Sequence, residues 1–138
     1  MADIVVGYDG SECSQAALDL AAAAAAALGD KIVVAFGYDA NPVGGELLDY
    51  AKSLHELGEQ RTSEGAERAR ASGADVETVV ISGSPAQALA DLADQRDARM
   101  IVVGTYSESP IKGAILGSTP HKLLHLASRP VLVVPLPD

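Results

Sequence analysis

The sequence predicts an α/β protein with a doubly wound, five-stranded parallel sheet in the order 3-2-1-4-5 and helices on both faces. Five short apolar runs, rich in β-branched residues, alternate with four segments of helical periodicity. These runs are apolar almost throughout, as in parallel strands that are buried on both faces. The strict alternation of strand and helix indicates right-handed crossovers between parallel strands.

The first two strands flank a helix that is rich in alanine. Residues 4–7 form a β-branched run that ends in glycine, and residues 32–36 form a second run of this kind. Between them, residues 14–28 have the composition of a strong helix. Ser11 supplies an N-cap hydroxyl, and Gly29 ends the helix because glycine readily adopts the left-handed conformation of a C-cap.

A long helix and a third strand follow. Residues 46–71 repeat apolar side chains at helical spacing, and Gly73 ends this helix. Gly58 and Gly65 are expected to weaken its middle, because glycine in a helix costs about 1 kcal/mol relative to alanine. Residues 76–81 alternate enough to form the third strand.

The C-terminal part of the chain repeats the alternation of helix and strand twice. Ser84 is expected to cap a third helix, which Pro85 opens because proline is tolerated at the first helical position. The expected elements are this helix to residue 93, a strand at 100–104, a helix at 120–127 and a strand at 131–134.

Composition and charge limit the class of protein. With 138 residues, 48% of them hydrophobic, the chain is long enough for one domain, 1–138, with its own core. The net charge of −9, without a basic cluster, argues against nucleic acid and membranes as partners. The single Cys13 excludes an internal disulfide. The sequence lacks a signal peptide, and the apolar stretch at 20–28 is too short to span a bilayer, so a cytoplasmic location is expected.

Two strand ends mark the expected binding site. In a sheet of this order the winding reverses between strands one and four, and ligands bind at the carboxyl ends of the strands there. Gly7 ends the first strand and Gly104 the fourth, and a polar loop follows each glycine. The site is therefore expected between these two strand ends.

The segment after the fourth strand has the features of an anion site. It reads GTYSESPIKGAILGST from Gly104 onward and leads into Pro120. Thr119 is expected to be the N-cap of the last helix. The backbone amides of Gly117, Ser118 and Thr119 would then point out of a helix N-terminus, which suits a phosphate group.

The spacing in this segment resembles a motif of the universal stress protein family. Members that bind ATP carry the pattern G-x2-G-x9-G-[ST] after their fourth strand. The matching positions here are Gly104, Ser107, Gly117 and Ser118, with Ser107 in place of a glycine. The opening VGYDGS and the closing RPVLVV also resemble the family's first and last strands, so the likeness spans the whole chain.

The resemblance implies an adenine-nucleotide site built from several parts of the chain. The adenine side would comprise Gly7, Asp9 and Phe36. Val103 would flank the base and Gly104 would meet the ribose, so valine at 104 is expected to abolish binding and to leave the fold intact. The phosphates would be held by Ser107, Gly117, Ser118 and Thr119. The implied ligand is ATP, with or without a divalent cation.

Alternatives remain open for Asp9 and for the ligand. An aspartate after a strand also commonly caps the next helix or orders a turn. Ser107 departs from the motif, and Glu108 adds a negative charge beside the expected triphosphate. The alternatives are therefore a cyclic nucleotide, whose single phosphate meets less repulsion, and a nucleotide-free protein that acts through dimerisation.

The resemblance implies a binding module in the stress response, and the residues give no sign of an enzyme. It contains no Walker-type motif and no convincing Ser-His-Asp or Cys-His arrangement. His121 and His125 are four residues apart but lack a third ligand, so they are expected to be solvent-exposed on a helix rather than to hold a metal.

The last strand is expected to form a homodimer interface. Residues 131–134 would lie at one edge of the sheet, and an exposed apolar edge tends to pair with another chain. The resemblance implies the same interface, because the family commonly dimerises there. Pro135 and Pro137 would limit the length of such pairing, since proline cannot donate to a ladder.

Overall fold

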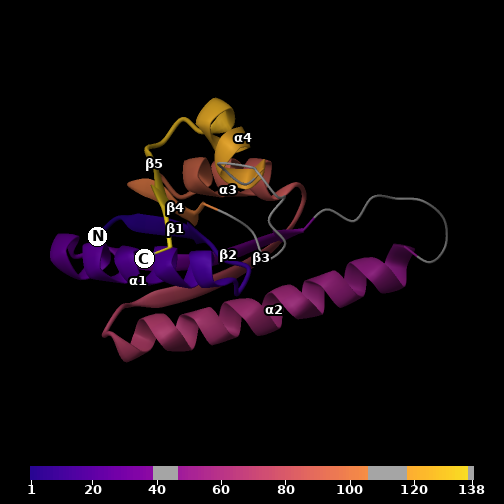
Figure 1. The fold of residues 1–138 in the computed structure, drawn as a ribbon, viewed down its shortest axis with the longest axis horizontal. Coiled ribbons are helices and arrows are strands. Elements are labelled where there is room, and N and C mark those ends of the chain that lie inside the picture. The colour runs from indigo at the N-terminus through magenta and orange to yellow at the C-terminus, as the bar shows by residue number, and fades with distance from the viewer. Residues whose placement is uncertain (39–46, 106–117, 137–138) are drawn as a thin grey trace.

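The computed structural model describes residues 1–38, 47–105 and 118–136. Its elements, in chain order, are β1 (Asp3–Gly7), α1 (Glu12–Leu28), β2 (Lys31–Tyr38), α2 (Leu47–Ala71), β3 (Val76–Ser82), α3 (Pro85–Gln95), β4 (Met100–Gly104), α4 (Ser118–Leu126) and β5 (Val131–Val134). The five strands form one parallel sheet in the order β3-β2-β1-β4-β5, which confirms the predicted topology (Figure 1).

The helices cover the sheet on both sides, with α1 and α2 on one face and α3 and α4 on the other (Figure 1). Successive strand residues point to opposite faces, so Val6 and Val34 face α1 while Val5 and Val33 face α3. All four valines are fully buried. The continuous apolar runs in the sequence therefore reflect strands with a helix layer on each side.

Helix boundaries confirm some of the predicted caps and correct others. The Ser11 hydroxyl accepts a hydrogen bond from the Ser14 amide at 3.2 Å, and Gly29 is left-handed with φ 73°. Ser84 precedes α3 as predicted but makes no side-chain cap hydrogen bond. The prediction that Thr119 is an N-cap is wrong, because α4 begins at Ser118 and Thr119 lies in its first turn.

Helix α2 continues without interruption through Gly58 and Gly65, although the sequence suggested a weak middle. Both glycines lie against the sheet. An alanine Cβ would lie 2.6 Å from Cδ1 of Phe36 at position 58, and 2.9 Å from Cε2 of Tyr8 at position 65. The two glycines therefore allow a close approach of helix and sheet, and packing outweighs their low helix propensity.

A network of ion pairs joins the amino ends of the strands. Lys31 Nζ lies 3.0 Å from Glu77 Oε1 and 4.0 Å from Asp3 Oδ1. Arg96 pairs with both carboxylates. The network ties the starts of β1, β2 and β3 to the end of α3.

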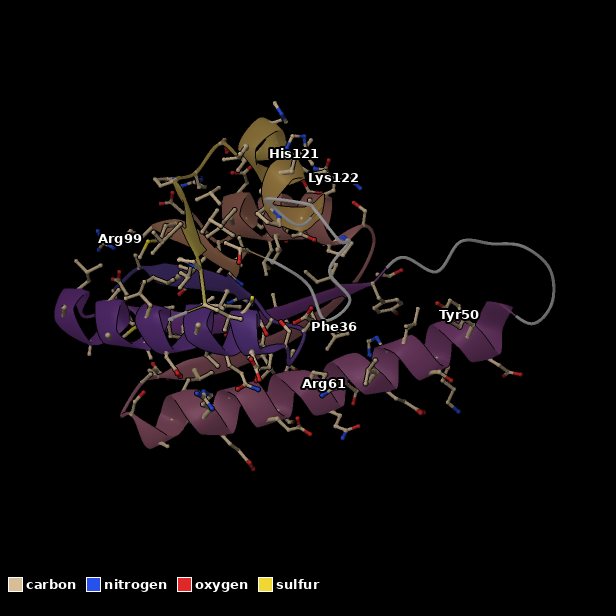
Figure 2. The ribbon with its side chains drawn as sticks, in the orientation of Figure 1. Phe36, Tyr50, Arg61, Arg99, His121 and Lys122 are labelled. Carbon is tan, nitrogen blue, oxygen red and sulfur yellow. The ribbon has the colours of Figure 1, made fainter. Side chains whose placement is uncertain are left out.

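A second pair lies nearby and involves a buried acid. The Asp30 side chain is 1% exposed and pairs with Arg99, which precedes β4. Asp30 Oδ1 also accepts a hydrogen bond from the Ala2 amide at 3.0 Å. The hydrogen bond from Arg99 holds the pKa of Asp30 below its ordinary value. Figure 2 shows Arg99 at the end of the sheet away from Phe36.

Acid is expected to destabilise the protein partly through Glu77. Hydrogen bonds from Arg96 and then Lys31 lower the pKa of Glu77 from 4.5 to about 2. A pKa that is lower in the folded state gives stability that is present above pH 4.5 and lost as the pH falls towards 2. The urea midpoint should therefore decline over this range.

The matched variant is Glu77→Gln, which keeps the shape and removes the charge. Its urea midpoint should be lower at neutral pH and should decline less steeply between pH 4.5 and 2. Asp30 titrates in the same direction, so some slope will remain. An identical slope in parent and variant would show that Glu77 contributes nothing to acid sensitivity.

Candidate functional site

A crevice opens at the carboxyl ends of β1, β2 and β4, where the winding of the sheet reverses. The strands and the turn after β1 contribute Gly7, Tyr8, Asp9, Ala35, Phe36, Gly37, Val103 and Gly104. The N-terminal parts of three helices contribute the remainder, which are Ser14, Pro85, Leu89, Thr119 and Pro120. The site therefore lies at the predicted switch point between β1 and β4.

The crevice is small and mostly apolar. It encloses about 140 Å³, and a cavity of about 150 Å³ is known to hold a benzene ring. Tyr8, Phe36, Leu89 and Val103 are among the apolar residues that line it. Such a space suits the flat ring of a planar ligand whose polar parts extend outward.

Tyr8 is held firmly in its wall of the crevice. The residue is 5% exposed, and its amide donates a hydrogen bond to the Ala35 carbonyl at 2.9 Å. Burial raises the pKa of the Tyr8 phenol above its ordinary value, so the phenol is neutral at physiological pH. Tyr8 therefore offers a rigid aromatic surface rather than a charge.

Asp9 orders the turn that leads from β1 into α1. Its Oδ1 accepts a hydrogen bond from the Ser11 amide at 2.9 Å, which is the turn-ordering role that the sequence left open. Gly10 next to it has φ 87°, a conformation that favours glycine. The Ser14 hydroxyl donates to the Ser11 carbonyl at 3.0 Å and completes the turn. Asp9 also lines the crevice, so the turn holds its carboxylate at the site.

Gly104 is packed against the start of α1. An alanine Cβ at this position would lie 2.7 Å from the backbone carbon and oxygen of Cys13. Because backbone atoms cannot move aside cheaply, the expectation that valine at 104 would leave the fold intact is wrong. Gly104 is needed for the fold as well as for the shape of the crevice.

The N-terminus of α4 meets the crevice beside β4. Thr119 and Pro120, in the first turn of this helix, line it. The first amides of a helix have no partner within the helix, and the helix dipole places positive charge there. The crevice therefore has an apolar part for a ring and a helix N-terminus for an anion.

The structure brings together most of the residues predicted from the sequence. Those that line the crevice are Gly7, Asp9, Phe36, Val103, Gly104 and Thr119. Ser118 begins α4 next to Thr119. Ser107 and Gly117 lie outside the described residues.

Sequence reasoning missed the contributions of α1 and α3 and that of Ala35 on β2. Ser14, Ala35 and Leu89 are ordinary helix or strand residues, so their patterns carry no sign of a site. Pro85 carried a weak signal, because it follows the Gly83-Ser84 turn after β3 and such turns gather at the carboxyl ends of parallel strands.

His121, His125 and Cys13 do not line the crevice. His121 and His125 are exposed on α4, with ring centroids 5.4 Å apart. Within the described ranges, no three His, Cys, Asp or Glu side chains come together as metal ligands. Cys13 is a buried free thiol. Every helix in the described part of the chain is too short or too polar to cross a lipid bilayer.

The chain is a doubly wound α/β protein with a crevice at the switch point of its sheet. Residues 1–135 match the model of the Usp family, described as the universal stress protein family. The chain therefore belongs to the universal stress protein family, as its loop motif suggested.

Relatives support this assignment along nearly the whole chain. A universal stress protein of Mycobacterium tuberculosis is 37% identical over 145 residues, which cover 95% of this chain and 94% of the relative. A crystal structure of a universal stress protein in complex with cAMP is 32% identical, with a TM-score of 0.79 and coverage of 99% and 98%. The protein from Archaeoglobus fulgidus in complex with dAMP is 23% identical, with a TM-score of 0.70 and coverage of 97% of both chains, and shares the fold.

Proposed function

We propose that this protein is a non-catalytic regulatory module of the stress response that binds an adenine nucleotide in the crevice between β1 and β4. The crevice at the switch point is the observation that carries the proposal, because it combines an apolar, ring-sized space with a helix N-terminus. Gly7, Asp9, Phe36 and Val103 form its base side, and Gly104 lies where the ribose would pass.

The phosphate side extends along α4 and the segment before it. Thr119 lines the crevice, and Ser118 begins the helix. The sequence motif adds Ser107 and Gly117, which complete the spacing of ATP-binding relatives. ATP, with or without a divalent cation, is therefore our first candidate ligand.

Cyclic AMP is the second candidate. A relative that is 32% identical over nearly the whole chain was crystallised in complex with cAMP. A single cyclic phosphate also avoids part of the repulsion that Glu108 would exert on a triphosphate. Both ligands would place the same adenine ring in the apolar part of the crevice.

Calorimetric titration with ATP, AMP and cAMP in one buffer tests the proposal. Phe36→Ala is expected to weaken binding of each bound nucleotide about tenfold, since stacking of a base on an aromatic ring contributes about 1–3 kcal/mol. Tyr50→Ala is the matched control, because Tyr50 is 56% exposed and lies near the far end of α2 (Figure 2). If the parent protein binds none of the three nucleotides, the proposal fails, and the alternative of a nucleotide-free protein that acts through dimerisation remains.

We further propose that two copies pair through β5. This strand lies at an edge of the described sheet. Exposed apolar side chains occur on β5, on α4 and on the segment after β5, namely Leu132, Leu124, Leu126 and Leu136. An apolar strand edge of this kind favours pairing with another chain.

Light scattering at micromolar concentration should therefore give the mass of a dimer. Leu132→Lys should shift the protein to monomer, because a charge on an edge strand opposes pairing. Leu20→Lys is the matched control, since Leu20 is 45% exposed on α1, and this variant should remain dimeric. A monomeric parent would contradict the proposed interface.

A further inference from the structure

We infer that α2 sets the width of the crevice, because its Gly58 and Gly65 pack against the rings of Phe36 and Tyr8, and both of these residues line the crevice. The ligand invoked below rests on the proposed function. The contacts between α2 and the residues that line the crevice do not depend on that function.

The contacts fall on one face of α2. Positions 58, 61 and 65 are separated by three and four residues and so lie on the same side of the helix. Gly58 lies against Phe36, and Gly65 lies against the ring of Tyr8. Between them, Arg61 lies over the turn after β1, with its Cδ 2.9 Å from the position of an added Cβ at Gly10. Figure 2 shows Arg61 on the middle part of α2.

Neither position 58 nor position 65 has space for a side chain larger than that of glycine. At position 65 a Cβ would lie 2.9, 3.0 and 3.2 Å from three ring carbons of Tyr8. At position 58 it would lie 2.6 Å from Cδ1 of Phe36 and 2.9 Å from Cγ1 of Val80. An added methyl group must therefore displace an aromatic ring or the helix.

Both residues whose rings contact α2 also take part in the lining of the crevice. Tyr8 is 5% exposed, and it belongs to the core cluster beneath α1 and α2. Tyr8 and Phe36 both border the crevice. A shift of either residue would therefore change the wall of the space proposed for the adenine ring, and a ligand in that space would in turn hold α2 in place.

The test compares Gly58→Ala and Gly65→Ala with Gln60→Ala, an exposed position on the same helix. Helix propensity alone predicts that both glycine variants have a higher urea midpoint than the parent. The inference predicts a lower midpoint for both, with the loss in Gly58→Ala partly restored by Phe36→Leu, which provides space for the methyl group. A raised midpoint in the glycine variants would overturn it.

Two further measurements separate crevice shape from general stability. At a temperature where circular dichroism shows each variant folded, both glycine variants should bind cAMP or ATP at least about tenfold more weakly than Gln60→Ala. Crystal structures of the variants should show the Phe36 or Tyr8 ring displaced, and rings in their parental positions would overturn the inference. If the parent binds no nucleotide, the proposed function fails, and the ring positions still decide the inference.

Discussion

Valine at position 104 is expected to destabilise the protein by about 3 kcal/mol or more, at the upper end of the range for overpacked cores. The first added carbon would already lie 2.7 Å from the backbone of Cys13, and the branched methyl groups would add further contacts. Chemical denaturation should show this loss as a lower midpoint, or the variant should fail to accumulate as a folded protein. Such a loss is a large fraction of the stability of a small domain, about 5–15 kcal/mol.

Gly73→Ala is a suitable control for the Gly104 variant. Gly73 has φ 90° and no atom near the position of an added Cβ, so alanine there causes backbone strain without a clash. That strain should cost about 1–2 kcal/mol. A Gly104→Val protein as stable as the control would show that α1 moves away from β4 easily, which the buried contacts between them argue against.

Repair of the loop motif is expected to tighten ATP binding by at least about tenfold. Ser107→Gly restores the motif of ATP-binding relatives, and Glu108→Arg replaces repulsion of a phosphate with attraction. A charge-assisted contact contributes about 1.5–3 kcal/mol, so the double variant should exceed this threshold. Both residues lie outside the described ranges, so this prediction rests on the spacing of the motif.

Titration of the parent and of the double variant with ATP, AMP and cAMP distinguishes the candidate functions. Tightening confined to ATP would support a weakened ATP site. Glu67→Arg, at an exposed position on α2, changes the charge by the same amount elsewhere and should have no such effect. Equal tightening in the Glu67→Arg control would assign the effect to net charge. If none of the three proteins binds any of the nucleotides, the result would favour a nucleotide-free protein that acts through dimerisation.

The sequence predicted the sheet order and a crevice between the ends of the first and fourth strands, because both follow from local patterns. The apolar runs that end in Gly7 and Gly104 identify two strands and their carboxyl ends, and the topology brings these ends together. The capping pair Ser11 and Gly29 was equally clear, since caps depend on residues a few positions apart.

Contacts between distant segments account for the errors. Gly58 and Gly65 looked unfavourable because helix propensity treats α2 as an isolated helix, whereas their neighbour Phe36 comes from β2 and Tyr8 from the turn after β1. Gly104 looked replaceable because its close contact with Cys13 joins positions that are far apart in the sequence. The motif that suggests a ligand-facing glycine gave no sign that the same glycine is also part of the core.

The ion pairs and the crevice occupy opposite ends of the same strands, and they share no residue. Asp3, Lys31 and Glu77 lie where their strands begin, while Gly7, Phe36 and Gly104 lie at or near the ends where strands finish. Substitutions that adapt ligand preference therefore fall at one end of the sheet and leave the electrostatic anchoring at the other unchanged. This separation gives the scaffold room to diversify, because a change in what it binds need not erode its tolerance of acid.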